Sequence, residues 1–201
     1  MPCGDGRISL GLAAAGHDVT GIDLSPRFVE VASRTASERH LTARFEVADM
    51  RDLSFDAEFD AVVNFGGSFR YFDHEGNAAF VGPVARALRS GGQFLIDTVT
   101  PETIFSRFQE QPWRSVGDML GLIENRFDHS SGGMESDWVV VTHDGRRERR
   151  HSSMRLYTFR ELADMLESSG FAGVEGFDGG EGGPFRLGAY RLILLAARKT
   201  E

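Results

Sequence analysis

Two short segments near the amino terminus carry the residue types best suited to binding chemistry. Cys3-Gly4-Asp5-Gly6-Arg7 places two glycines in a turn that opens a helix, and Asp23 ends a strand 17 residues after Gly6. Glycine lets the backbone approach a ligand where a side chain would collide, and the N–H groups at a helix start suit a carboxylate or a phosphate. A carboxylate after the next strand can accept hydrogen bonds from ribose hydroxyls. The spacing therefore predicts a nucleoside site.

A third candidate is Asp49-Met50, which follows a strand expected at Ala43 to Ala48. Ligands of open α/β sheets bind beyond the carboxyl ends of the strands, where an acid can accept a hydrogen bond from an exocyclic adenine amine. Alternatively, Asp49 caps the segment that follows the strand.

The elements that must position these residues alternate between strand and helix over the first hundred residues. Ser25 is expected to cap a helix whose first position is Pro26, and Gly91-Gly92 is expected to end a later helix that carries Phe80, Val84 and Leu88. Further helical spacing covers 7–15, and apolar runs predict strands at Asp18–Asp23, Ala43–Ala48, Phe59–Phe65 and Gln93–Val99. This order predicts a doubly wound, mostly parallel, Rossmann-like α/β sheet.

The pattern changes in the second half of the chain. About residues 113–157 are expected to form an antiparallel β insertion that covers the substrate side, with a type I′ hairpin turn at Asp144-Gly145. Thr158 and Glu161 have capping-box spacing at the start of another helix. Phe171–Phe177 and Tyr190–Arg198 then predict a closing strand pair, which should be antiparallel because no helix separates the strands.

Composition limits the partners that we expect. A length of 201 residues fits one domain, residues 1–201, and a net charge of −8 argues against a nucleic-acid partner. One cysteine allows no intrachain disulfide, which favours a reducing, cytoplasmic location. The sequence has no apolar run of about 18 residues to suggest a membrane partner. It also has no Cys/His cluster with the spacing of metal ligands, so we expect no metal site.

Taken in order, these motifs resemble those of the class I S-adenosylmethionine-dependent methyltransferases. The glycine turn resembles the first motif, Gly21-Ile22-Asp23-Leu24-Ser25-Pro26 the ribose motif, and Ala48-Asp49-Met50 the adenine motif. The run Phe59 to Phe65 resembles the fourth-strand motif beside the sulfur. Leu88-Arg89-Ser90-Gly91-Gly92 resembles the turn before the fifth strand, with Ser90 in place of the usual proline. A closing antiparallel strand pair is a hallmark of this family.

The resemblance implies a cofactor, S-adenosylmethionine, and a set of residues that bind it. The implied cofactor-binding residues are Cys3, Gly4, Asp5, Gly6, Asp23, Leu24, Ser25, Asp49, Met50, Asn64 and Phe65. It also implies a small-molecule acceptor that is methylated on nitrogen or oxygen. A nucleic-acid acceptor is disfavoured because Asn64-Phe65-Gly66-Gly67 lacks the proline–aromatic signature of base-amine enzymes.

The start of the chain departs from the family pattern. The family places a strand directly before the first motif, whereas only Met1 and Pro2 precede Cys3 here. A strand of about 5–6 residues cannot be built from two. We therefore expect a domain that lacks most of its first strand and a sequence that begins inside a longer natural protein.

Catalysis of methyl transfer depends mainly on in-line positioning, which can supply roughly 7–11 kcal/mol without a catalytic side chain. Where a base is needed, His74 and Tyr71 are the candidates, followed by His151 and Tyr157. Phe69, Tyr71 and Trp113 are candidates to line the acceptor pocket, and core packing is the alternative role for Phe69. Nothing in the sequence specifies an oligomeric state.

Two other functions remain open at this level. An NAD-dependent oxidoreductase would share the glycine turn and Asp23, although Ser9 stands where a third glycine is usual. A non-catalytic S-adenosylmethionine-binding protein would tolerate the missing first strand. Cys3 is not expected to act as a nucleophile, because nothing near it in the sequence would lower its pKa.

Overall fold

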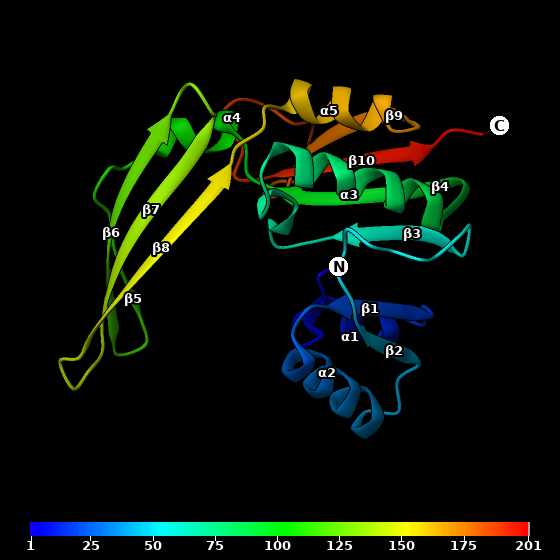
Figure 1. The fold of residues 1–201 in the computed structure, drawn as a ribbon, viewed down its shortest axis with the longest axis horizontal. Helices are drawn as coiled ribbons and strands as arrows, with labels where there is room; N and C mark the ends of the chain where they lie inside the picture. The colour runs from blue at the N-terminus through cyan, green and yellow to red at the C-terminus, as the bar shows by residue number, and fades with distance from the viewer. Residues whose placement is uncertain (201) are drawn as a thin grey trace.

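The computed structural model describes residues 1–200 and contains an α/β body and an antiparallel β arm, which Figure 1 shows side by side. The body begins with α1 (Arg7–Ala14), β1 (Val19–Asp23), α2 (Pro26–Glu38), β2 (Ala43–Val47), β3 (Phe59–Asn64), the 3-10 turn η1 (Ser68–Arg70), α3 (His74–Ala87), β4 (Leu88–Thr98), α4 (Pro101–Ile104) and η2 (Phe105–Arg107). The arm contains β5 (Trp113–Val116), β6 (Met119–Asp128), β7 (Gly133–Val141) and β8 (Arg147–Arg155). The chain returns to the body with α5 (Phe159–Ser168), β9 (Phe171–Asp178) and β10 (Leu192–Arg198).

The strands of the body form two hydrogen-bonded groups. β1 and β2 run parallel, and the second group has the order β3-β4-β10-β9. In that group β3 is parallel to β4, and β10 is antiparallel to both of its neighbours. The Rossmann-like α/β fold and its antiparallel closing strand pair are therefore confirmed.

A gap separates the two strand groups between β1 and β3. The first residues of the chain cross it at one end, where the Cys3 N–H donates to the Ile22 carbonyl at 2.7 Å. The Met1 amino group donates to the Val63 carbonyl at 2.5 Å. Within residues 1–200 no backbone pairing joins β1 directly to β3. Three residues therefore bridge the position that a whole strand would occupy.

The hydrophobic core lies between the second strand group and the helices α3 and α5, which cover the same face in Figure 1. Phe80 and Val84 of α3, Phe94 of β4, Leu166 of α5 and Leu194 of β10 are fully buried there. The carboxyl ends of β1, β3 and β4 point toward the arm (Figure 1).

The caps expected at two helices are present. Ser25 caps α2, since its hydroxyl accepts from the Phe28 N–H at 3.4 Å, and Pro26 follows as the first helical residue. At α5, the Glu161 N–H donates to the Thr158 hydroxyl at 3.2 Å, and the Thr158 N–H donates to the Glu161 carboxylate at 2.8 Å. These hydrogen bonds satisfy N–H groups that the first helical turn leaves free.

The expectation that Gly91-Gly92 end a helix is wrong. α3 runs through Pro83 to Ala87, and Leu88 is already extended (φ −80°, ψ 145°). The glycines instead lie inside β4, where the pairing with β3 shifts register, and Gly91 has φ +76°. A Cβ on Gly92 would lie 2.9 Å from the Arg89 carbonyl oxygen, so this irregular stretch of β4 needs glycine.

The hairpin turn at Asp144-Gly145 also differs from expectation. Val141 pairs with Arg147, so the loop contains five residues rather than the two of a type I′ turn. The Thr142 N–H donates to the Arg146 carbonyl at 3.0 Å, which closes the loop, and Gly145 has φ +80°. β8 begins directly after this loop, at Arg147.

The gap predicts a sharp contrast in amide hydrogen exchange. The Ile22 carbonyl faces the gap, and alternate residues of a strand share a direction, so the Thr20 and Ile22 amides point into it. Both amides should exchange at least about a hundredfold faster than the Leu194 amide, whose strand is paired on both sides. Exchange measured by NMR on the intact chain tests this. Equal protection at the three positions would show that the gap is closed in solution.

Candidate functional site

The glycine turn has the backbone shape that its sequence predicted. Gly4 and Gly6 have φ of +56° and +92°, in the left-handed region that disfavours other residues. A Cβ on Gly6 would lie 3.0 Å from Ala32 and Leu10, so Gly6 also allows α1 to pack closely. At Gly4 nothing lies within 4 Å of that position. Gly4 therefore exposes bare backbone to open space.

Asp23 ties this turn to the end of β1. One carboxylate oxygen accepts from the Gly4 N–H at 2.8 Å, and the other accepts from the Ser25 N–H at 2.9 Å. A single side chain thus fixes the glycine turn relative to the start of α2. Each oxygen keeps a lone pair for a further donor.

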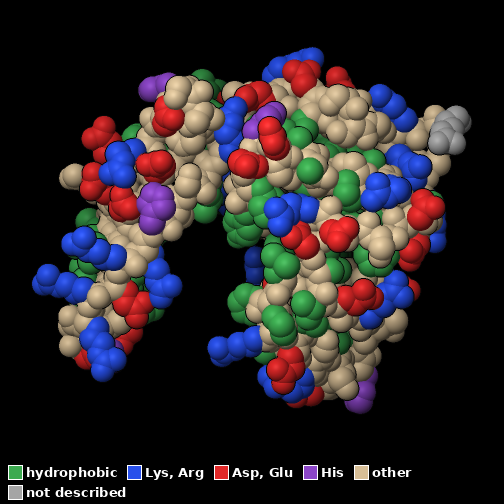
Figure 2. Space-filling model, in the orientation of Figure 1, with side chains coloured by type: hydrophobic (Ala, Val, Ile, Leu, Met, Phe, Trp, Pro, Cys, Tyr) green, Lys and Arg blue, Asp and Glu red, His purple; other side chains and the backbone are tan. Residues whose placement is uncertain are grey.

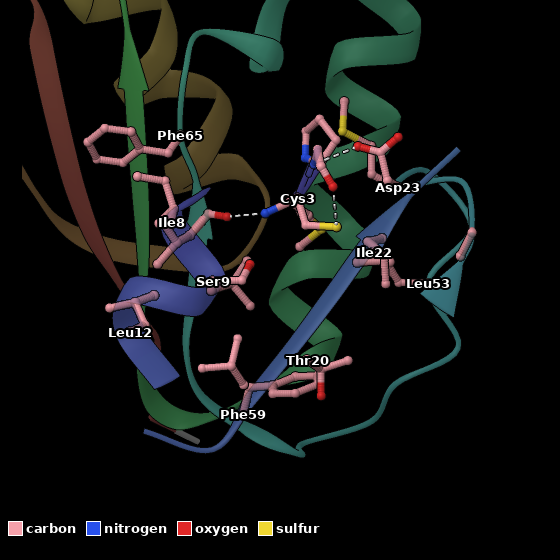
Figure 3. A pocket seen from close by; sticks show the side chains of 18 of the residues that line it. Cys3, Ile8, Ser9, Leu12, Thr20, Ile22, Asp23, Leu53, Phe59 and Phe65 are labelled. Atoms are coloured by element: carbon pink, nitrogen blue, oxygen red, sulfur yellow. Dashed lines mark hydrogen bonds between the residues drawn. The ribbon is translucent and has the colours of Figure 1, made fainter. Parts of the chain in front are cut away.

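These residues border a cavity of about 940 Å³. In Figure 3, Asp23 and Phe65 lie at the same end of the cavity, with Cys3 between them. The predicted site residues that line it are Cys3, Gly4, Asp5, Asp23, Leu24, Met50, Phe65 and Tyr71. The structure therefore brings together candidates that are up to 68 positions apart in the sequence, from Cys3 to Tyr71.

The cavity continues past Cys3 into the gap between β1 and β3. Thr20 and Phe59 lie at this other end in Figure 3, and Ile22 and Val62 add apolar walls. The enclosed space is therefore longer than the polar end alone, and its two ends differ in chemistry. The end with Asp23 and the glycine turn offers backbone N–H groups and one carboxylate, whereas the end in the gap has apolar walls and charged residues such as Asp18, Arg44 and Arg89.

Asp49 and Asn64 are two predicted cofactor residues whose side chains are engaged elsewhere. The Asp49 carboxylate pairs with the Arg51 guanidinium, with a shortest N–O distance of 2.6 Å, and these hydrogen bonds hold the pKa of the carboxyl below its usual value. Asn64 is fully buried and its Oδ1 accepts from the Ser68 hydroxyl at 3.2 Å. The Asn64 Nδ2 has no hydrogen-bond partner within residues 1–200.

The structure places three other candidates outside the cavity lining. Phe69 is 1% exposed and packs in the core against Phe80 and Tyr157, so the core role applies to it. Trp113 is 69% exposed on the arm. The His74 Nδ1 lies 3.4 Å from the Tyr157 hydroxyl, whose pKa is raised by burial.

The Cys3 thiol is held in its protonated form. Burial, together with the nearby Asp23 charge, raises the pKa of Cys3 to about 11. A thiol with that pKa has almost no thiolate at neutral pH and is a poor nucleophile. Cys3 therefore lines the cavity without the properties of a nucleophile, as the sequence predicted.

Asp97 is a functional candidate that the sequence patterns did not single out. This carboxylate is 3% exposed and accepts from the Gly66 N–H at 2.9 Å and from the Arg191 side chain. The Gly67 N–H donates to the Asp97 backbone carbonyl at 3.0 Å. Only the position of Asp97 near the end of a predicted strand could have pointed to it, because its partner Arg191 lies 94 residues away.

Two further features of residues 1–200 bear on the class of site. No group of three or more His, Cys, Asp or Glu side chains is placed to hold a metal ion. No helix is long and apolar enough to cross a membrane. The groups at the polar end of the cavity are the glycine turn, the Asp23 carboxylate and the start of α1.

These features are those of a Rossmann-like α/β fold with a candidate nucleoside site, and known proteins of this kind resemble the chain. Residues 1–92 match the methyltransferase domain family. The chain is 29% identical over 184 residues to YqeM of Bacillus subtilis, a match that covers 85% of this chain and 71% of that protein. The fold matches the CcbJ methyltransferase of Streptomyces caelestis with a TM-score of 0.85 and 15% identity, over 98% of this chain and 81% of CcbJ.

The fold also matches S-adenosylmethionine-bound CalS10, an amino pentose methyltransferase of Micromonospora echinaspora, with a TM-score of 0.70 and 19% identity. That match covers 98% of this chain and 80% of CalS10. The chain therefore has the fold of these methyltransferases, and its residues 1–92 resemble a methyltransferase domain.

The double hydrogen bond of Asp23 generates a test of the site. Asp23→Asn keeps the shape but replaces one acceptor oxygen by a donor, so the Gly4 turn loses its anchor and the ligand loses a charged partner. Affinity for S-adenosylhomocysteine should fall by more than about 1 kcal/mol, or at least about fivefold, in calorimetry. Asp56→Asn, at an exposed position, is the matched control. Unchanged affinity of the Asp23 variant would place the cofactor elsewhere.

Proposed function

We propose that this chain is an S-adenosylmethionine-dependent methyltransferase that methylates a nitrogen or oxygen of a small molecule held between the α/β body and the β arm. The observation that carries the proposal is the direction of the cavity: its polar end lies at the carboxyl ends of β1 and β3, which point toward the arm (Figure 1). Figure 2 shows open space between the arm and the body. The arm, roughly residues 113–157 within a single domain, would cover an acceptor in that space.

The residues at the polar end fit the cofactor. No side chain caps the first turn of α1 and no acidic residue lies in it, so its N–H groups suit the methionine carboxylate. The bare backbone at Gly4 gives that group room to approach. The remaining lone pairs of Asp23 suit the ribose hydroxyls.

The adenine would lie against Met50, which is 6% exposed and lines the cavity. Asp49 can hold the adenine amine while it stays paired with Arg51, because a carboxylate accepts more hydrogen bonds than that pairing uses. Leu24, which is 61% exposed beside Asp23, adds an apolar edge to the same end.

When bound, S-adenosylmethionine supplies a methyl group that is already activated by its sulfonium. The chain then has to hold the acceptor in line with that methyl group, and such positioning can supply roughly 7–11 kcal/mol. Phe65 lines the same end of the cavity as Asp23, where its ring would exclude water from the reacting methyl group. His17, the histidine that lines the cavity, precedes β1, whereas Asp23 lies at the opposite end of that strand. Positioning rather than a histidine base therefore accounts best for transfer.

The acceptor would meet an aromatic surface at the cavity mouth. Tyr71 lines the cavity and is 57% exposed, so its ring can contact a cationic amine. CalS10, which has the same fold, is an amino pentose methyltransferase. An amine or hydroxyl on a polar small molecule is consistent with both observations.

Binding and transfer are tested in sequence. S-adenosylhomocysteine should bind this chain in calorimetry, whereas NAD should not. Radiolabelled methyl from S-adenosylmethionine should then move to members of a panel of small amines and alcohols that includes amino sugars. Binding of NAD with no binding of S-adenosylhomocysteine would overturn the cofactor assignment. Label transferred only to protein or nucleic acid would overturn the small-molecule acceptor.

A further inference from the structure

Two arginine side chains from distant parts of the chain converge beside the cavity mouth. Arg70 is the last residue of η1, and Arg191 directly precedes β10. The Nη2 atoms of Arg70 and Arg191 lie 3.3 Å and 3.6 Å from the position that a Cβ on Gly67 would occupy. Both guanidinium groups therefore meet over the same glycine.

The charges of this arginine pair are only partly balanced. Arg191 forms an ion pair with Asp97, whose other oxygen is already used by the Gly66 N–H. Arg70 donates its Nε–H to the Gly67 carbonyl at 3.2 Å and has no carboxylate within 4 Å among residues 1–200. Among residues 1–200, Arg191 thus has a carboxylate partner, whereas the Arg70 guanidinium has none within 4 Å.

The surroundings make that charge costly. Burial, and then the nearby charge of Arg191, lower the pKa of Arg70 to about 10. The Arg191 Nη2 is shielded from water and has no hydrogen-bond partner within residues 1–200. Buried charges and hydrogen-bond donors in proteins are normally paired. A bound anion would supply the partners that the Arg70 guanidinium and the Arg191 Nη2 lack among residues 1–200.

The location connects the pair to the acceptor rather than to the cofactor. Gly66, Ser68 and Tyr71, which are close to Arg70 in sequence, all line the cavity, whereas the uncapped start of α1 lies on the other side of the gap. A third arginine near the root of the arm is already occupied: Arg107 donates to the Tyr190 carbonyl and stacks on the Tyr190 ring at 4.8 Å. Arg70 and Arg191 are therefore the donors available for an anion.

We infer that Arg70 and Arg191 bind an oxyanion of the methyl acceptor, a carboxylate or a phosphate group, and so select an anionic substrate. The inference rests on the proposed function, because it assigns part of the acceptor to the space beside Gly67. Planar guanidinium groups pair with carboxylate and phosphate through two parallel hydrogen bonds. Asp97 holds Arg191 in place and leaves Arg70 as the main charged donor.

The test is a titration of the intact chain with inorganic phosphate and, separately, with acetate, at ionic strength held constant with sodium chloride. The Nε–Hε signals of arginine side chains are followed by NMR, with and without saturating S-adenosylhomocysteine. Saturable shifts are expected at Arg70 and Arg191 in both conditions. Tighter binding of phosphate would indicate a phosphate group on the acceptor, and tighter binding of acetate would indicate a carboxylate.

Substitutions distinguish anion binding at the arginine pair from a non-specific effect of positive charge. Arg70→Gln should weaken anion binding, sensed at Arg191, by at least about tenfold, and Arg70→Lys should be intermediate because it keeps the charge but loses the planar fork. Arg107→Gln removes the same charge nearby and should stay within about twofold of the unmodified chain, since Arg107 already has its partners. The Arg70→Lys result keeps the test valid if the glutamine variant folds poorly.

Three results would overturn the inference: shifts that do not saturate, unchanged phosphate affinity in both Arg70 variants, or phosphate that competes with S-adenosylhomocysteine. Competition would assign the arginine pair to the cofactor carboxylate instead. Failure of S-adenosylhomocysteine to bind would contradict only the proposed function, because the titration without it reads the arginine pair separately.

Discussion

The geometry of the site depends on two hydrogen bonds from backbone N–H groups to the Asp23 carboxylate. Among residues 1–200, no atom lies within 4 Å of the Cβ position of Gly4. The bonds from Gly4 and Ser25, together with the Cys3–Ile22 backbone hydrogen bond, join the glycine turn, the end of β1 and the start of α2 in one unit. The Asp23 carboxylate can still accept hydrogen bonds from ribose hydroxyls. The same side chain therefore positions the glycine turn and is available to bind the ligand.

Asp97 has the corresponding position across the gap in the sheet. It accepts the Gly66 N–H after β3 and pairs with Arg191 before β10, so it shapes the second glycine-containing turn and orients a cation. Each side of the site thus rests on one acid near a strand end that holds the backbone of a glycine turn. On the Asp23 side the arrangement faces the proposed cofactor site, and on the Asp97 side it faces the proposed acceptor site.

Much of this organisation could be predicted from the sequence, because local rules govern it. Ser25-Pro26 and Thr158–Glu161 mark helix starts by short-range hydrogen bonding, and apolar runs mark buried strands. The failures involve choices that local patterns do not determine: Gly91-Gly92 suits a helix end or a bulge equally, and only its pairing with β3 decides between them. Asp97 and the Arg70–Arg191 pair were missed because their partners meet only in the folded chain.

A crystal structure of this chain with bound S-adenosylhomocysteine is the decisive measurement for the cofactor site. We expect the ribose hydroxyls on Asp23, the amino-acid carboxylate at the start of α1 and the sulfur toward Phe65, with the space under the arm left for the acceptor. A ligand bound instead in the gap between β1 and β3, or one that does not contact Asp23, would show that the cofactor site is elsewhere.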